Sequence, residues 1–189
     1  MTELAFEPTI DLPVQGEVIN TPSVTVSALP IAGKLVLRAE GDAIAKAVKK
    51  ALKLELPKGV TDLTRADGIE AMWMGPDETL LVCDIDQLAA TQAAIGKAAA
   101  KLHHSLVDVS DYYISMQIQG AKAREVLAKH VPADMHPSAF VDGTVIRTRF
   151  AKATAVLVAR GDDTFELMVR WSFAQYAAEL LRVSCLEYA

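Results

Sequence analysis

The sequence predicts an α+β fold in which antiparallel or mixed sheets, built from split βαβ (ferredoxin-like) units, are covered by helices. Short apolar runs of strand type occur in pairs that are joined by turns, which favours antiparallel pairing. Segments with helical periodicity separate these strand pairs. The chain has 189 residues, of which 51% are hydrophobic and 23% charged, and this balance is typical of a globular protein.

The N-terminal segment 1–22 is predicted to be an extended arm, and residues 23–189 a single compact domain. The first 33 residues contain no Lys or Arg and hold half of the prolines of the chain. Apolar side chains in the arm fall on alternate positions, namely Leu4, Phe6, Ile10, Leu12 and Val14. An extended chain with this period has one apolar face. That face packs either on the chain's own domain or on a partner subunit, and both alternatives stay open.

The first half of the compact domain is expected to form two strands, a helix, a hairpin and a second helix. The predicted strands are 23–29, 34–39, 68–75 and 79–85, and the predicted helices are 43–54 and 86–102. Gly75, Pro76 and Asp77 supply the hairpin turn. Asp42 and Asp86 are expected to cap the two helices, because a carboxylate accepts hydrogen bonds from backbone N–H groups of the first turn.

The second half is expected to continue with two strands, a helix, three strands and a final helix. The predicted strands are 105–109, 114–119, 144–150, 154–159 and 165–171, and the predicted helices are 121–130 and one that starts at Ser172. Gly120 opens the first of these helices. Ser172 and Gln175 fit a capping box for the second, in which side chains bond the backbone of the first turn.

Charge and composition argue against several classes of function. A formal net charge of -5 argues against nucleic acid and anionic membranes as partners. No uncharged apolar run reaches the roughly 18 residues that a membrane span needs. The N-terminus has no basic segment followed by an apolar one, so a cytoplasmic location is expected. Cys83 and Cys185 are far apart in the sequence and are expected to be buried thiols.

Polar residues that could bind a ligand are few, and each has a structural alternative. Asp108, Ser110 and Asp111 follow a strand, where they form Asx and Ser turns or contact a ligand. Lys122 and Arg124 lie at a helix start, which is an ordinary turn or an anion site. A metal site is not predicted, because the candidate ligands lack the required spacing; they are His103, His104, Asp108, Asp134 and His136. We also predict no catalytic residue.

Aromatic residues form two groups. Trp73 lies between Met72 and Met74 in a predicted strand, so its side chain takes the opposite face and is a candidate for an interface. Trp171, Phe173 and Tyr176 form a second group, which is expected to pack in the core between the last helix and a sheet.

Three segments carry a resemblance to a known family. They are MWMGPDETLL at 72–81, LVDVSD at 106–111 with IQGAKAREVLA at 118–128, and DMHP at 134–137 followed by Phe140, Gly143, Thr148 and ELMVRWSFA at 166–174. In their order and spacing these segments resemble the gamma subunits of heterotetrameric sarcosine oxidases. That family is in turn similar to the folate-binding aminomethyltransferases of glycine cleavage.

The resemblance implies an aminomethyltransferase folate-domain-like fold and the role of a non-catalytic structural subunit. The implied complex is flavin-dependent and oxidises sarcosine with O₂ to glycine, H₂O₂ and a one-carbon unit that passes to tetrahydrofolate. The implied partners are the alpha and beta subunits, which carry FAD, FMN and NAD, and a delta subunit, which carries zinc. The candidate interface residues are Leu4, Phe6, Ile10, Leu12, Val14 and Trp73.

Two alternatives remain from the sequence. The chain is either a standalone folate-binding protein or a subunit of a sister complex that oxidises another N-methylated amine. In the first alternative Asp108, Ser110 and Arg124 are the candidate folate contacts.

Overall fold

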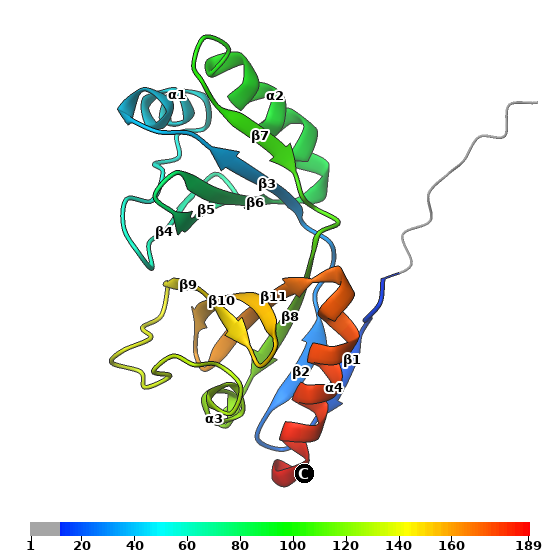
Figure 1. The fold of residues 1–189 in the computed structure, drawn as a ribbon. Helices are drawn as coiled ribbons and strands as arrows, with labels where there is room; N and C mark the ends of the chain where they lie inside the picture. Colours follow the sequence, from blue (N-terminus) through cyan, green and yellow to red (C-terminus); the bar gives the residue numbers. More distant parts are fainter. Residues whose placement is uncertain (1–11) are drawn as a thin grey trace, which may run out of the picture.

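Most strands of this chain carry apolar residues on both faces, which requires that both faces be covered. In the computed structural model, which describes residues 12–189, two antiparallel sheets pack face to face and helices cover their outer faces (Figure 1). The succession is therefore helices, sheet, sheet, helices. Each sheet has one core under its helices, and a third core lies between the sheets.

The five-stranded sheet has the strand order β4-β5-β6-β3-β7. Its elements are β3 (Gly33–Arg38), α1 (Asp42–Leu52), β4 (Leu63–Ala66), β5 (Ile69–Gly75), β6 (Glu78–Cys83), the 3-10 turn η1 (Ile85–Gln87), α2 (Leu88–Ala98) and β7 (Ser105–Asp108). The order β5-β6-β3-β7 is that of two interleaved split βαβ units, with β4 added at one edge. Leu35 and Leu37 of β3 pack under Ile44 and Val48 of α1.

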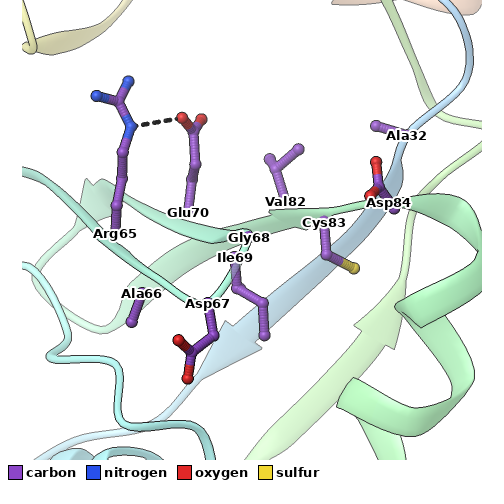
Figure 2. A pocket seen from close by; sticks show the side chains of 10 residues that line it. All are labelled: Ala32, Arg65, Ala66, Asp67, Gly68, Ile69, Glu70, Val82, Cys83 and Asp84. Carbon is purple, nitrogen blue, oxygen red and sulfur yellow. Dashed lines mark hydrogen bonds and ion pairs between the residues drawn. The ribbon is translucent and has the colours of Figure 1, made fainter.

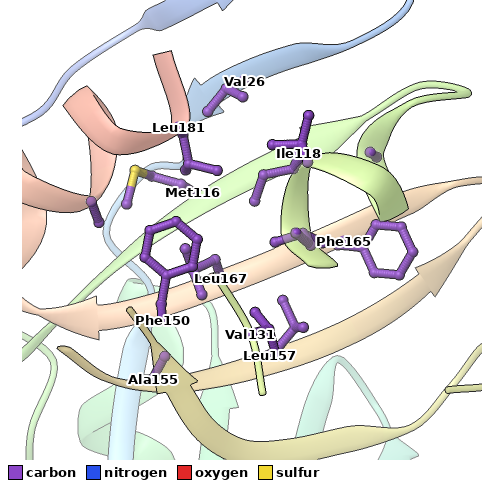
Figure 3. Close-up of a cluster of buried hydrophobic side chains, with 14 of the residues drawn as sticks. Val26, Met116, Ile118, Val131, Phe150, Ala155, Leu157, Phe165, Leu167 and Leu181 are labelled. Atoms are coloured by element: carbon purple, nitrogen blue, oxygen red, sulfur yellow. The ribbon is translucent and has the colours of Figure 1, made fainter. Parts of the chain in front are cut away.

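The six-stranded sheet has the strand order β1-β2-β8-β11-β10-β9. Its elements are β1 (Glu17–Asn20), β2 (Thr25–Ala28), β8 (Tyr113–Gln119), α3 (Ala123–Ala128), β9 (Val145–Phe150), β10 (Ala153–Gly161), β11 (Thr164–Arg170), the 3-10 turn η2 (Trp171–Phe173), α4 (Ala174–Cys185) and the 3-10 turn η3 (Leu186–Tyr188). Figure 3 shows its core, where Phe150, Leu157 and Leu167 gather on the sheet and Leu181 reaches down from α4.

The core between the sheets is smaller and is built from alternate residues of the same strands. Met72, Met74 and Leu80 of the five-stranded sheet meet residues of the six-stranded sheet. The latter are Val145, Val156, Val158 and Met168. Because side chains alternate along a strand, β5 places Ile69 and Ala71 toward the helices and its methionines toward the opposing sheet.

The predicted fold class is confirmed, since every strand pair in residues 12–189 is antiparallel and the split βαβ order occurs. Two strands were not predicted. Strand β1 lies in the proline-rich segment 1–22, where it extends the six-stranded sheet by pairing with β2. Strand β4 has the short mixed sequence Leu-Thr-Arg-Ala, which has no clear alternation. The division into an arm 1–22 and a domain 23–189 remains a prediction.

The three predicted helix caps are wrong. Asp42 is the first residue of α1, and the preceding Gly41 takes the cap position with φ 85°. Asp86 and Ser172 lie inside η1 and η2, and no capping side-chain hydrogen bond forms at α2 or α4. The physical reason is that a 3-10 turn precedes each of these two helices. Its backbone bonds, such as Gln87 N–H to Asp84 O at 2.9 Å, take the place of a side-chain cap.

Candidate functional site

Asp108 and Ser110, two of the candidate folate contacts, lie at the end of β7. Asp108 Oδ1 accepts hydrogen bonds from the Ser110 N–H at 2.9 Å and from the Ser110 hydroxyl at 2.6 Å. Ser110 Oγ in turn accepts the backbone N–H of Lys34 at 2.9 Å. These bonds are those of an Asx and Ser turn that ties the β7–β8 connection to β3, which favours the structural interpretation of this cluster.

Arg124, the third candidate, holds the loop that follows α3. Its Nη1 donates to the carbonyl oxygens of Met135 and Phe140, both at 3.0 Å. Its guanidinium stacks 4.8 Å from the ring centroid of Phe165. The Asp142 carboxylate lies 3.6 Å away. The side chain is therefore engaged on several sides, and only Nε is buried without a hydrogen-bond partner among the described atoms of this side chain.

The structure does not bring the three candidates together. Asp108 and Ser110 precede β8, whereas Arg124 follows it, and a seven-residue strand spans roughly 23 Å. The turn at one end of β8 and the guanidinium at the other cannot contact one small ligand head group. The three residues therefore do not converge on one small group, and their role as folate contacts remains a prediction.

Other reactive side chains in residues 12–189 also stand apart. No group of three His, Cys, Asp or Glu residues there has the geometry of a metal site. His136 Nδ1 lies 2.8 Å from Ser138 Oγ, and His104 Nδ1 lies 2.9 Å from Leu102 O. Cys83 and Cys185 are buried free thiols, as predicted, and burial raises the pKa of both. A raised pKa keeps a thiol protonated and weakly nucleophilic.

A cavity of about 380 Å³ opens at one end of the five-stranded sheet (Figure 2). Arg65 pairs with Glu70 at 2.6 Å on one wall. Figure 2 shows that these two side chains stand on one side of the sheet, whereas Asp67 and the Cys83 thiol point to the other side. The cavity therefore wraps around a sheet end, and its polar groups do not converge on one point.

A partly buried network of charges joins the two sheets, and sequence reasoning missed it. Arg160 of β10 donates to both carboxylate oxygens of Glu70 in the opposing sheet at 2.7 Å, and it also pairs with Glu166 of β11. Lys34 of β3 is 1% exposed, and burial lowers its pKa while the nearby Glu166 opposes that shift. The signal in the sequence is that Lys34 and Glu166 each interrupt an apolar strand. Such a network locks the sheets in one arrangement.

Of the predicted interface residues, Trp73, Leu12 and Val14 can be placed. Trp73 is half-buried and lines a groove of about 590 Å³ between α1 and the β5–β6 turn. Leu12 is half-buried, and Val14 packs against the core of the six-stranded sheet beside α4. Leu4, Phe6 and Ile10 lie outside the described residues. The interface role of all these residues remains a prediction.

The C-terminal aromatic group is only partly in the core, which corrects one expectation. Phe173 packs against the core of the six-stranded sheet, but Tyr176 is 38% exposed.

Within residues 12–189, the helices are all too short or too polar to cross a membrane.

The two stacked sheets define an aminomethyltransferase type of fold. The chain superposes on the glycine cleavage system aminomethyltransferase T from Bartonella henselae with a TM-score of 0.65 at 14% identity, covering 84% of this chain and 45% of that one. The family model of the sarcosine oxidase gamma subunits matches residues 38–187, and the chain belongs to that family.

Individual relatives agree with this assignment. The chain is 28% identical over 177 residues to the sarcosine oxidase subunit gamma of Corynebacterium sp. (strain U-96), covering 92% of this chain and 84% of the relative. It is also 28% identical to the corresponding subunit of Arthrobacter sp., covering 88% and 82%. It superposes on a chain of the heterotetrameric sarcosine oxidase from Corynebacterium sp. U-96 with a TM-score of 0.83 at 28% identity, covering 91% and 88%.

Proposed function

We propose that this chain is a structural, non-catalytic subunit of a cytoplasmic heterotetrameric sarcosine oxidase. The observation that carries the proposal is the superposition, with a TM-score of 0.83 over nine-tenths of this chain, on a chain of such a complex. The site geometry supports it, because the candidate ligand-binding groups of residues 12–189 bond to their own backbone and do not converge.

In this proposal the chemistry belongs to other subunits. Alpha and beta subunits bind FAD, FMN and NAD, and a delta subunit binds zinc. The complex removes two electrons from the methylamine group of sarcosine and passes them to O₂, which yields H₂O₂, glycine and a one-carbon unit for tetrahydrofolate. The chain contributes surface that fixes the geometry of its partners, and a stable interface of this kind buries more than about 1,000 Å².

The test is to tag the chain in its own host, purify it under mild conditions and identify the accompanying proteins by mass spectrometry. We expect flavoprotein subunits in fixed proportion and oxidation of sarcosine by the purified material. Preference for another N-methylated amine would favour a sister complex instead. Recovery of the chain alone, without any flavoprotein, would contradict the proposal.

A further inference from the structure

We propose that the free edge of β7 binds an extended strand of another subunit by β-augmentation. This inference deepens the proposed function, because it names the surface through which the chain joins its complex. Within residues 12–189, β7 pairs with β3 on one side and with no strand on the other. It is also an exposed strand, with only Leu106 half-buried among its four residues.

The register of β7 shows which backbone groups face outward. Val109 N–H donates to Lys34 O at 2.8 Å, so Val107, two residues earlier, exchanges its backbone bonds with its partner on β3. The backbone groups of Leu106 and Asp108 alternate with these and point away from β3. They form the ladder that an added strand requires.

In residues 12–189, two of the other three sheet edges carry exposed arginines that discourage strand addition, whereas β7 carries none. Arg147 and Arg149 are exposed on β9, and Arg65 is exposed on β4. The β1 edge carries the exposed Glu17, whose carboxylate accepts a hydrogen bond from Asn20 at 3.2 Å. Charged side chains are a common protection of edge strands. On β7 the only charged residue is Asp108, whose carboxylate is bonded to Ser110 in the following turn.

Apolar and aromatic groups lie on β7 and in the turn that follows it. Val107 is 50% exposed on β7, and Tyr112 is 38% exposed one turn further on, where its N–H donates to Val109 O. Tyr112 also contacts Tyr113 edge-on at 4.7 Å. Aromatic residues and arginine are enriched at the centres of protein interfaces.

The exposed charge of Arg170, next to Tyr112, indicates which kind of partner strand fits here. The Arg170 guanidinium lies 5.2 Å from the ring centroid of Tyr112 and is exposed. Among residues 12–189, no carboxylate lies within 4.0 Å of it. The fitting occupant is therefore an extended segment with apolar residues at alternate positions for Val107 and Tyr112, and with a carboxylate placed to meet Arg170.

Two lysine substitutions test the proposal in the assembled complex. Val107→Lys places a charge at the edge, and Val141→Lys is the matched control, because Val141 is 45% exposed in the loop before β9. We expect V107K to lower recovery of the chain in the complex about tenfold or more and V141K to leave it unchanged. Equal recovery of both variants would overturn the proposal while leaving the proposed function intact. Failure of the unsubstituted chain to recover partners would instead contradict the proposed function.

Amide hydrogen exchange provides a second readout that does not depend on substitution. In the complex, the amides of Leu106 and Asp108 are expected to exchange at least about tenfold more slowly than in the chain alone. Amides on the outer edge of β9 serve as the internal reference. Loss of this protection on deletion of residues 2–11, with the complex still assembled, would show that the chain's own N-terminal segment covers β7 and would overturn the partner-strand proposal.

Discussion

At the scale of single residues, the polar side chains that the sequence suggested as ligand contacts bond to neighbouring parts of the fold. Arg124 shows this best, because its guanidinium donates hydrogen bonds to two backbone carbonyl oxygens and stacks on the ring of Phe165. The sequence placed Arg124 at a helix start, which fits an anion site equally well. The alternatives are an anion site and a structural contact. The structure favours the structural contact, because the loop 131–144 lies against Arg124 and its carbonyl oxygens accept the hydrogen bonds of the guanidinium.

Arg124→Ala is expected to lower the free energy of unfolding by about 2–4 kcal/mol, because two carbonyl oxygens lose their donor in a part-buried site. Denaturant unfolding measures the change. Arg149→Ala, at an exposed position of β9, is the control and should stay within about 0.5 kcal/mol of the unsubstituted chain. An R124A variant as stable as the control would contradict a structural role.

His130 gives a pH dependence of stability with a definite sign. Its ring nitrogen lies 2.6 Å from Ser184 Oγ and its ring packs on Phe150, and burial, with Lys129 as a second cause, lowers its pKa below 6.5. The unfolded state then binds more protons, so stability is present above pH 6.5 and is lost as the pH falls toward the lowered pKa.

The measurement is the free energy of unfolding between pH 5 and 8 for the unsubstituted chain and for His130→Asn. The unsubstituted chain should lose more stability on acidification than H130N. His136→Asn, in an exposed loop, should follow the unsubstituted chain. Parallel curves for H130N and the unsubstituted chain would show that His130 has no such shift.

At the scale of elements, alternation and helical periodicity predicted most of the strands and all four helices, although their ends differ by a few residues. Strand β1 was missed because its four residues, Glu-Val-Ile-Asn, show no alternation and lie between Pro13 and Pro22, and its pairing with β2 is what makes it a strand. The predicted caps of α2 and α4 were wrong because a 3-10 turn precedes each of these helices, and its backbone bonds take the place of a side-chain cap.

Two glycines differ in whether the fold requires a glycine at their position. Gly120 has φ +125°, and a Cβ there would lie 2.4 Å from Ser23 O, whereas a Cβ on Gly96 in α2 meets nothing within 4 Å. Gly120→Ala should therefore destabilise by more than about 2 kcal/mol. Gly96→Ala should stabilise by about 0.5–1 kcal/mol, because alanine is the better helix former. Thermal unfolding of both variants checks the pair, and a tolerated G120A would show that the β2–α3 contact can relax.

At the scale of the whole molecule, the division into two sheets could not be predicted from the sequence. The chain enters the six-stranded sheet with β1 and β2, leaves it for β3 to β7, and returns with β8. Nothing local in the sequence marks these crossings, because β7 and β8 are separated by a short turn like that of a hairpin. The charge network between the sheets was missed for the same reason.

Arg160→Met tests that network. The change leaves Glu166, whose side chain is 10% exposed, without its main partner, and should lower the free energy of unfolding by about 3–5 kcal/mol. The triple variant Lys34→Met, Arg160→Met, Glu166→Leu should recover part of the loss, because it replaces Glu166 together with both cations beside it, and apolar side chains can take the place of a buried ion pair. Arg182→Met, which breaks an exposed pair with Glu179, is the control and should have little effect. An R160M variant that behaves like R182M would mean that the sheets are held by their apolar core alone.

The most direct test of the account is the visible spectrum of material purified through a tag on this chain, recorded before and after sarcosine is added without oxygen. If the chain is a structural subunit of a sarcosine oxidase, flavin absorbance accompanies it in fixed ratio and is bleached by sarcosine. Colourless material of the mass of the single chain, 20.3 kDa, would contradict the account.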